Sequence, residues 1–427
     1  MSSPFTGGRT LMLGSAATGI LCLALTVLGF ARDATLAATS WLLAFTYWTG
    51  LTMASLLIVV IFNTAAAKWI TLLRRQLEHH ASALAVCAAA FAGVVLSAKH
   101  LYLWADEEAV QRLPEHARHL IHHKHAWLNV PGFTLRGAIC LAIFLGVWFL
   151  LDRASRRQET RPPDDKLRST TRGLSAGSLF FLALAMTSGA VDWLMSLEPE
   201  WFSAIFGVYW FAGSFVSAIA LLMLAVMVPS DPNLAAARTS NQHVANLAAL
   251  LFAFSCFWAY AGFSQYLIIW QANLPEEVSW LSARGLFDLA RFHRGIDPPL
   301  SAAEWNPTGT AWFPVTALLI IGRFALPFLL LLSYHVKRDR KLLTALAVWT
   351  LTMQFVDTFW MIKPALRLRS AGLALPEATV TWTDVTAWVG LGALCFAFVL
   401  FRMRGRHAVP LNDPTLEYSV HYRQPLA

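Results

Sequence analysis

The segment VANLAALLFAFSCFWAYAGFSQYLII, Val244–Ile269, contains 26 consecutive residues without an Asp, Glu, Lys or Arg. An α-helix rises about 1.5 Å per residue, so about 20 residues cross the roughly 30 Å hydrocarbon layer of a bilayer. A helix formed by this segment has apolar side chains on every face, which is typical of a helix surrounded by lipid or by other helices. The segment therefore predicts a transmembrane helix.

Nine further apolar runs of similar length lie on either side of this segment. They are Leu11–Phe30, Trp41–Phe62, Ser82–Leu103, Phe133–Leu151, Leu174–Met195, Phe206–Val228, Trp312–Leu332, Leu342–Met361 and Val380–Phe401. Helices are one of the two structures that satisfy all backbone polar groups inside a bilayer. We therefore expect an all-α, polytopic membrane protein with about ten transmembrane helices, the first of which is retained as a span.

The composition agrees with this class. Hydrophobic residues make up 57% of the 427 residues and charged residues 14%, whereas a soluble domain carries about 25% charged residues. The 18 tryptophans cluster near the ends of the apolar runs, at the depth where the headgroup region favours them. The formal net charge of +8 is explained by basic loops, so we predict no nucleic-acid partner.

The loops on the two sides of the membrane differ in charge. The side that holds both termini carries 20 Lys and Arg residues, and the other side carries 10. Basic loops remain in the cytoplasm according to the positive-inside rule. We expect a multi-pass protein of the bacterial inner membrane with both termini in the cytoplasm.

The five cysteines lie inside apolar runs and form no CxxC or CxxCH pattern; they are Cys22, Cys87, Cys140, Cys256 and Cys395. Covalent haem c, a cysteine-ligated cluster and a structural disulfide therefore have no support in the sequence. We interpret these residues as small apolar side chains in helix interiors.

Two parts of the chain are similar to each other. Residues 187–199 (TSGAVDWLMSLEP) and 352–364 (TMQFVDTFWMIKP) align without gaps at an offset of 165 residues and share Thr, Val, Asp and Pro. An offset of four spans preserves the direction through the membrane. The pattern predicts two parallel four-helix bundles, formed by spans two to five and six to nine, plus two peripheral helices.

This arrangement divides the chain into four parts. Residues 1–40 hold the N-terminal span, residues 41–200 the first bundle, residues 201–365 the second bundle, and residues 366–427 the last span and the cytoplasmic tail.

Asp192 and Asp357 occupy equivalent positions in the repeat, a turn or two inside the outer boundary. A carboxylate at the centre of a bilayer costs about 2.5–3.5 kcal/mol on insertion scales, so such acids face the bundle interior and often have a function. The functional interpretation is a proton acceptor or relay, or a hydrogen-bond partner of a bound headgroup. The structural alternative is a helix cap or an interhelical hydrogen bond near the interface.

Further polar candidates lie in the third and seventh runs. His100, at the outer end of the third run, either exchanges a proton near neutral pH or lies at the interface with its tip in water. Tyr260 and Ser264 are four residues apart and share a helix face, and Gln265 and Tyr266 follow them. These four side chains either line a polar path or bond neighbouring helices.

A histidine cluster lies in the loop after the third run, at His116, His119, His122, His123 and His125. Spacings of three and four residues fit a metal on one helix face, but no carboxylate or cysteine completes a familiar ligand set. We favour a solvated loop and predict no metal site. Haem b requires facing histidines within spans, and His100, His243 and His335 lie near spans on mixed sides, so we exclude it.

Three stretches of the sequence resemble a known family. Asp192–Gly213, Phe257–Glu277 and Lys124–Asn129, the last followed by Arg136, resemble the second large membrane subunit of alternative complex III, a bacterial quinol:cytochrome c oxidoreductase. The resemblance covers spans three to nine. It implies the fold of the polysulfide-reductase membrane anchor, with two four-helix bundles and no haem or cluster of its own.

The same resemblance implies a function and partners. The chain would be a membrane subunit that supports quinol oxidation and proton translocation, with menaquinone or ubiquinone as the quinone and no covalently bound cofactor. Its partners would be membrane lipid, a homologous quinol-oxidising membrane subunit, an iron–sulfur subunit and cytochrome c subunits. Asp192 and His100 would lie near the outer quinol region. A structural anchor without its own quinol site and a secondary transporter remain alternative interpretations.

Overall fold

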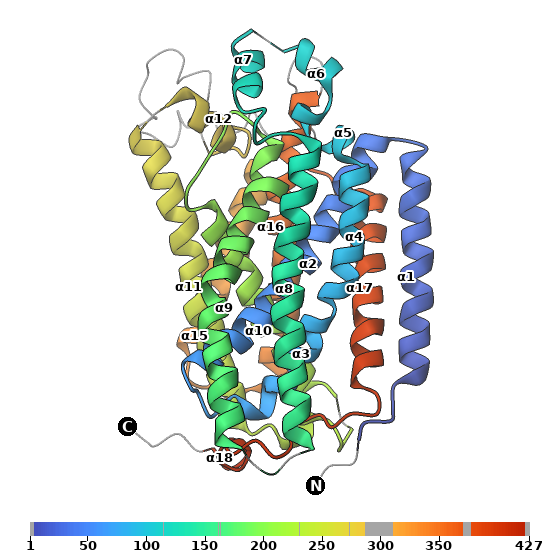
Figure 1. Ribbon diagram of the computed structural model, residues 1–427. Coiled ribbons are helices and arrows are strands. Elements are labelled where there is room, and N and C mark those ends of the chain that lie inside the picture. The colour runs from blue at the N-terminus through green and yellow to red at the C-terminus, as the bar shows by residue number, and fades with distance from the viewer. Residues whose placement is uncertain are drawn as a thin grey trace.

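The computed structural model describes residues 4–113, 115–160, 162, 164–229, 231–272, 274–286, 311–369 and 377–422. Within these ranges the regular structure is helical, apart from one antiparallel bridge between Phe5 and Arg406. Ten segments of the described chain have the length and hydropathy of membrane spans, which confirms the predicted all-α, polytopic fold. Both termini lie at the same end of the bundle (Figure 1).

The spans agree in number and order with the apolar runs. They are α1 (Arg9–Phe30), α2 (Ala34–Thr64), α3 with α4 (Thr71–Ser82 and Leu84–Leu96), α8 (Val130–Glu159), α9 (Asp165–Trp193), α10 (Phe206–Met227), α11 (Asn241–Ala272), α14 with η5 and α15 (Phe313–Leu318, Leu319–Ala325 and Leu326–Leu332), α16 (Arg340–Ile362) and α17 (Trp382–Met403). The segment η5 is a π-helix.

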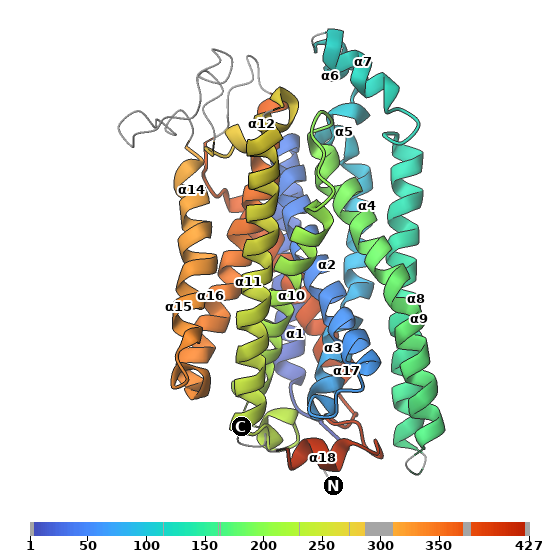
Figure 2. The same cartoon turned by 90° about the vertical axis from the view of Figure 1, so that its left-hand side faces the viewer.

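Shorter helices lie in the loops and the tail. They are α5 (Ala98–Leu101), η1 (Leu103–Ala105), α6 (Glu107–Gln111), α7 (Glu115–His123), η2 (Met195–Leu197), η3 (Ala235–Arg238), α12 (Pro275–Ser282), η6 (Val336–Arg338), η7 (Lys363–Arg369) and α18 (Leu416–Val420). We call the end of the bundle that carries both termini and α18 the terminal face. The end that carries α5–α7 and α12 is the far face (Figures 1 and 2).

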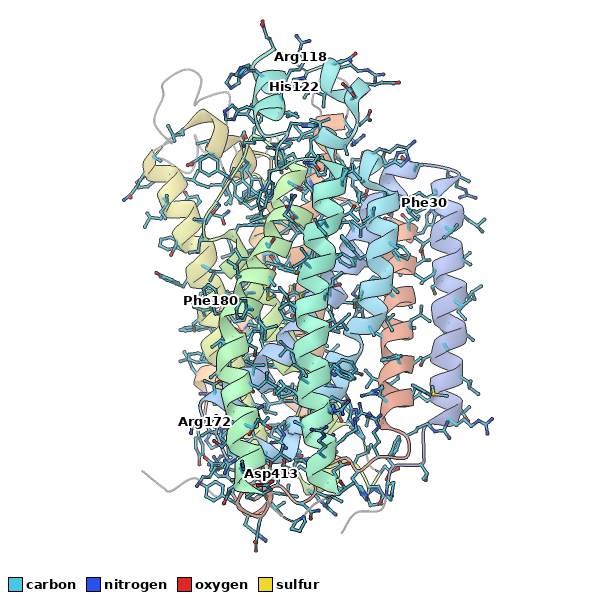
Figure 3. The ribbon with its side chains drawn as sticks, viewed as in Figure 1. Phe30, Arg118, His122, Arg172, Phe180 and Asp413 are labelled. Atoms are coloured by element: carbon cyan, nitrogen blue, oxygen red, sulfur yellow. The ribbon has the colours of Figure 1, made fainter. Side chains whose placement is uncertain are left out.

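Side-chain polarity follows the bundle axis. Arg172 and Asp413 lie toward the terminal face and Arg118 and His122 lie at the far face, whereas Phe180 lies between them on the outer surface (Figure 3). Phe180 is 68% exposed. Exposed apolar side chains between two charged ends are expected where a protein meets the hydrocarbon of a bilayer.

The spans α2 and α10 lie at the centre of the bundle. In one ring, α2 contacts α4 and α9, and α8 packs between α4 and α9. In a second ring, α10 contacts α11 and α16, and the span from α14 to α15 packs between α11 and α16. Figure 2 shows α8 and α9 on one flank and α14 and α15 on the other.

The two rings meet through their first and fourth spans. The first span of each ring, α2 and α10, contacts the other, and each also contacts the fourth span of the opposite ring: α2 contacts α16, and α10 contacts α9. The spans α1 and α17 pack against each other and against α2 outside the rings. These contacts are those expected of two four-helix units with two peripheral helices. The division of the chain into equivalent units remains a prediction.

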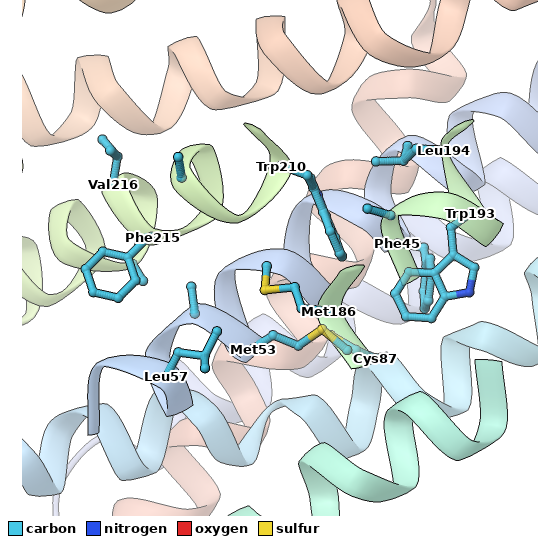
Figure 4. Close-up of a cluster of buried hydrophobic side chains, with 14 of the residues drawn as sticks. Phe45, Met53, Leu57, Cys87, Met186, Trp193, Leu194, Trp210, Phe215 and Val216 are labelled. Carbon is cyan, nitrogen blue, oxygen red and sulfur yellow. The ribbon is translucent and has the colours of Figure 1, made fainter. Parts of the chain in front are cut away.

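Aromatic side chains fill the junction between the rings. The ring centroid of Trp193 on α9 lies 5.0 Å from that of Phe45 on α2 and 5.9 Å from that of Trp210 on α10. Figure 4 shows these three side chains together, with the sulfur-containing side chains of Met53 and Met186 beside them. Edge-to-face pairs of this kind add about 0.5–1.5 kcal/mol beyond area burial, so the cluster holds spans of both rings in register.

The third span begins at Thr71 and ends at Leu96, whereas the sequence predicted Ser82–Leu103. Its first helix, α3, buries Arg75, which pairs with Glu159 at the end of α8, and Glu78, which accepts from Ser155 at 2.9 Å. Buried charges are tolerated when they are paired and hydrogen-bonded. The hydropathy of α3 is low because its own sequence contains Arg74, Arg75, Glu78, His79 and His80. The sequence did not show the partners on other segments that allow these residues to be buried, and this explains the wrong boundary.

Gly50 marks the close contact between α2 and α10. A Cβ atom built there would lie 2.4 Å from Ser214 Oγ and 3.2 Å from the Trp210 ring. Gly14 on α1 provides a control, since a Cβ atom there has no neighbour within 4 Å. Overpacking a helix contact costs about 1–3 kcal/mol, so Gly50→Val should lower the thermal unfolding temperature of the purified protein and Gly14→Val should not. Equal effects of the two substitutions would contradict this packing.

Candidate functional site

Asp192 lies near the far-face end of α9, where its carboxylate is bonded by α8. Arg136 Nε donates to Asp192 Oδ2 at 2.8 Å, and Arg136 Nη2 donates to Oδ1 at 3.0 Å. Trp127 Nε1 also donates to Oδ1 at 3.0 Å, and the guanidinium carbon of Arg136 lies 4.1 Å from the Trp127 ring centroid. A bidentate arginine–carboxylate pair is strong and directional. Asp192 therefore joins α8 to α9 and has a donor on each oxygen.

Asp357 on α16 has different partners. Tyr209 Oη of α10 donates to Asp357 Oδ1 at 2.5 Å, and Arg323 Nη2 of η5 lies 3.6 Å from Oδ2. The same Arg323 Nη2 donates to Gln354 Oε1 at 2.5 Å. Asp357 is 1% exposed. Its carboxylate is thus shared between a phenol and a more distant guanidinium.

The local backbone makes room for Arg323. The guanidinium carbon of Arg323 lies 4.7 Å from the Trp258 ring centroid, and its Nη1 has no acceptor among the described residues. A Cβ atom on Gly213 would lie 2.9 Å from Arg323 Nη2 and 3.3 Å from Asp357 Oδ2, so glycine is needed there. Single turns of π-helix such as η5 occur often at functional sites.

A cavity of about 600 Å³ borders the Tyr209 side chain. Its wall consists of Tyr209, Cys256, Trp258, Ala259, Tyr260, Gly262, Phe263, Gln265, Tyr266, Trp280, Leu281, Leu286, Thr316, Leu319, Ile320, Phe324 and Trp360. Most of these side chains are apolar or aromatic. Phe263 and Ile320 are also exposed on the outer surface, so the cavity reaches the lipid-facing side of α11 and η5.

A second set of buried charges lies beside Trp280, which lines this cavity. Glu198 Oε1 accepts from Arg284 Nη1 at 3.0 Å, and Glu198 Oε2 accepts from Arg367 Nη2 at 2.7 Å. The guanidinium carbon of Arg284 lies 3.7 Å from the ring centroid of Trp280 on α12. Burial lowers the pKa of Arg284 to about 10, and Glu198 opposes this shift. Arg284 therefore stays protonated at neutral pH and joins the end of α12 to Glu198 and to the Met361 carbonyl of α16.

The structure brings together most of the candidates from the seventh run. Tyr260, Gln265 and Tyr266 line the cavity, and Ser264 is not among its lining residues. Gln265 is buried, and its Oε1 accepts from Ser203 Oγ at 3.5 Å. The predicted polar path is therefore a mainly apolar cavity with a few polar side chains.

His100 lies in α5 at the far face and is half-buried. Burial and the nearby cations Lys99 and Arg369 lower its pKa, while Asp106 and Asp33 raise it. The net shift keeps its imidazole neutral at physiological pH. No hydrogen bond joins His100 to Asp192 or Asp357 among the described residues, and a shared site of His100 and Asp192 stays a prediction.

The histidine cluster lies on an amphipathic helix and the turn after it. Helix α7 buries Ala117 and Ile121, and all five histidines of the cluster are exposed. The described residues contain no group of three or more His, Cys, Asp or Glu side chains that could hold a metal ion. The cysteines are free, with Cys87 Sγ and Cys395 Sγ 3.8 Å apart between α4 and α17.

Three residues of these two sites carried no functional prediction in the sequence: Arg136, Arg323 and Tyr209. Each arginine lies in the third span of its ring, and each aspartate lies in the fourth span of the same ring. A cation inside an apolar run is a usable signal, because such a residue needs a buried partner. Tyr209 gave no such signal, since tyrosines are common near the ends of spans.

Comparison of the sequence with protein-family models and with curated proteins finds no match.

The two aspartates should differ in their effect on stability. Asp192→Asn removes the charge that compensates Arg136, and breaking a partly buried pair of this kind costs about 1–3 kcal/mol. Asp357→Asn keeps an acceptor for Tyr209, but it leaves the charge of Arg323 without a carboxylate. Arg323 is more deeply buried than Arg136, so this substitution should cost more, about 3–5 kcal/mol. Thermal unfolding of the two purified variants in detergent measures this difference. A larger loss for Asp192→Asn than for Asp357→Asn would contradict this order.

Proposed function

We propose that the chain is an integral membrane subunit of a bacterial quinol:electron acceptor oxidoreductase, and that the cavity beside Tyr209 accepts the quinol ring. One observation carries this proposal: a mainly apolar cavity of about 600 Å³ lies within the spans and ends on the Tyr209–Asp357 hydrogen bond. Pockets for small ligands are mostly apolar with a few converging polar groups. A quinol has this combination, since its ring bears two hydroxyl groups and its tail is lipid-soluble.

The cavity wall supplies partners for both parts of such a ligand. The hydroxyl of Tyr209 and the amide of Gln265 can bond the ring oxygens, and the rings of Trp258, Trp280 and Trp360 offer faces for stacking. The exposed lining residues Phe263 and Ile320 lie where an isoprenoid tail would leave toward lipid. The geometry therefore matches a ligand that enters from the membrane.

Tyr209 and Asp357 are arranged to remove protons from a bound quinol. Oxidation of a quinol to a quinone releases two electrons and two protons. Tyr209 can pass its proton to Asp357 at 2.5 Å and take one from the quinol hydroxyl. Asp357 must release each proton before it accepts the next. The electrons would leave to a redox centre of an iron–sulfur or cytochrome c partner subunit.

Proton movement through the chain is a second part of the proposal, and buried ionisable groups near the terminal face support it. Glu78, His79 and His80 of α3 are each at most 5% exposed, and His80 Nε2 lies 2.9 Å from Gln76 Nε2. Ionisable residues inside spans commonly mark proton paths. With the termini in the cytoplasm, these groups would face the cytoplasmic half of the membrane.

Removal of the Tyr209 hydroxyl tests the quinol site. Tyr209→Phe should weaken binding of a short-tailed quinol analogue about 5–10-fold, the effect expected for loss of one hydrogen bond. Binding is measured with the purified protein in lipid nanodiscs. Tyr47→Phe is the matched control, because Tyr47 Oη donates to the Leu351 carbonyl and does not line the cavity.

A cavity-filling variant makes the test independent of this hydrogen bond. A Cβ atom on Gly262 would lie 3.2 Å from the Tyr209 ring, so Gly262→Phe should fill the cavity and abolish binding. Binding that survives both Tyr209→Phe and Gly262→Phe would exclude this cavity as the quinol site. An analogue that never binds the intact protein or its complex would favour a structural anchor.

The proton path can be tested separately in proteoliposomes that contain the whole complex. Glu78→Gln keeps the size of the side chain but removes its ionisable proton, so quinol oxidation should continue while proton translocation is lost. Glu108 is exposed at the far face, away from α3, so Glu108→Gln is the control. Unchanged proton-to-electron ratios for Glu78→Gln would contradict a path through α3.

A further inference from the structure

A second cavity, of about 290 Å³, opens at the terminal face between α2, α3, α8, α9 and the C-terminal tail. Its wall consists of Phe62, Asn63, Ala66, Ala67, Lys68, Thr71, Arg74, Gln158, Asp165, Arg168, Ser169, Thr171, Arg172 and Thr415. Figure 3 shows Arg172 near this end of the bundle. We call this cavity the terminal-face pocket. It lies at the opposite end of the spans from the aspartate sites and is separate from the proposed quinol cavity.

The charge of the terminal-face pocket favours an anion. Four cationic side chains line it, at Lys68, Arg74, Arg168 and Arg172, together with one carboxylate, at Asp165. Arg74 is already paired, because its Nη1 lies 2.7 Å from Asp413 Oδ2. Among the described residues, no carboxylate pairs with Lys68, Arg168 or Arg172. The pocket therefore has uncompensated positive charge.

The partners of these cations are weak. Arg172 Nε donates to the Thr64 carbonyl at 3.2 Å, and Lys68 Nζ lies 5.6 Å from the Tyr418 ring centroid. Both contacts leave further N–H groups of each side chain available, since a guanidinium has five donors and an ammonium has three. An anion in the pocket can therefore be bonded without breaking the existing contacts.

Gln158 gives an independent sign that the pocket has a ligand. Its side chain is 5% exposed and lines the pocket, and its Nε2 has no acceptor among the described residues. Buried polar atoms in native proteins are almost always hydrogen-bonded. An acceptor oxygen in the pocket would satisfy this amide, and the neighbouring cations favour an acceptor that carries negative charge.

The place of the pocket identifies the kind of anion. It lies where α2, α8 and α9 reach the end of their spans, so its mouth is at the depth of lipid headgroups. Phe62, Ala66 and Ala67 form an apolar part of the wall beside the cations. A ligand with a phosphate group next to an apolar body fits both parts. Basic pockets between spans on the cytoplasmic side are typical binding sites for anionic headgroups.

We propose that the terminal-face pocket binds the phosphate group of an anionic phospholipid, with Lys68, Arg168 and Arg172 as cationic partners and the Gln158 amide as donor. The bound phosphate joins the hairpin between α8 and α9 to the end of α2. Soluble phosphate shares this chemistry and is the alternative source of the same group. The proposal does not depend on the quinol cavity.

The test uses the full chain purified in a neutral detergent. Phosphatidylglycerol, phosphatidylcholine or inorganic phosphate is added, and thermal unfolding and lipid retention in native mass spectrometry are measured. We expect phosphatidylglycerol to raise the unfolding temperature and to be retained, and phosphatidylcholine to do neither. Arg168→Gln with Arg172→Gln should weaken phosphatidylglycerol binding about 30-fold, since each cation contributes about 1 kcal/mol at an anionic surface.

Two further variants separate the pocket from general surface charge. Arg153→Gln with Arg157→Gln removes two exposed cations from the same end of α8 that do not line the pocket, and it should leave phosphatidylglycerol binding unchanged. Gln158→Met removes the buried donor at similar volume and should weaken binding without loss of charge.

Three results would overturn the proposal. One is equal retention of phosphatidylglycerol and phosphatidylcholine by the unaltered protein. This measurement does not depend on whether any variant folds. Another is an equal loss of binding in the pocket variant and the control variant. The third is full stabilisation by millimolar inorganic phosphate without lipid, which would assign the pocket to a soluble phosphate.

Discussion

A charged side chain inside an apolar helix bundle requires a partner, and this constraint determines how the spans of this protein are arranged. Asp192 and Asp357 each lie on the fourth span of a ring, and the third span of the same ring supplies an arginine. Breaking a buried pair leaves one charge uncompensated at a cost of several kcal/mol. The register of α8 against α9, and of η5 against α16, therefore cannot shift by a turn without that cost.

The two pairs share this arrangement but differ in the other donors that bond the carboxylate. Asp192 receives three N–H donors from Arg136 and Trp127, and this leaves little capacity for a substrate. Asp357 is bonded to the Tyr209 hydroxyl, which in turn lines a cavity. Gly213 and the π-turn of η5 supply the space that the second site needs. Two aspartates that each have an arginine partner on the preceding span thus differ in the donors that bond them.

The same constraint applies at the terminal face. Arg74 and Arg75 enter the bundle on α3 because Asp413 of the tail and Glu159 of α8 are there to pair with them. Asp413 remains ionised, since Arg74 and the Thr415 hydrogen bonds lower its pKa despite the opposing effect of burial. Segments far apart in the chain are therefore linked by charge at the end of the bundle that holds both termini. Lys68, Arg168 and Arg172 of the terminal-face pocket have no such carboxylate partner among the described residues.

The sequence by itself determined the class of the protein and the number and order of its spans. Each span depends mainly on its own hydropathy, so Val244–Ile269 predicts α11 (Asn241–Ala272) to within three residues at each end. The sequence also identified the two buried aspartates and three residues of the cavity wall. It misplaced the start of the third span, because a charged helix is stable in the bundle only through partners on other segments.

Only the tertiary structure decided which arginine meets which aspartate, that Tyr209 bonds Asp357, and that five segments enclose a basic pocket. Arg323 and Asp357 are 34 positions apart, and Tyr209 and Asp357 are 148 positions apart. Helical periodicity relates residues three or four positions apart and carries no information about such distances. The packing of whole spans brings these side chains together, and the physical reason is the cost of leaving a buried polar group without a partner.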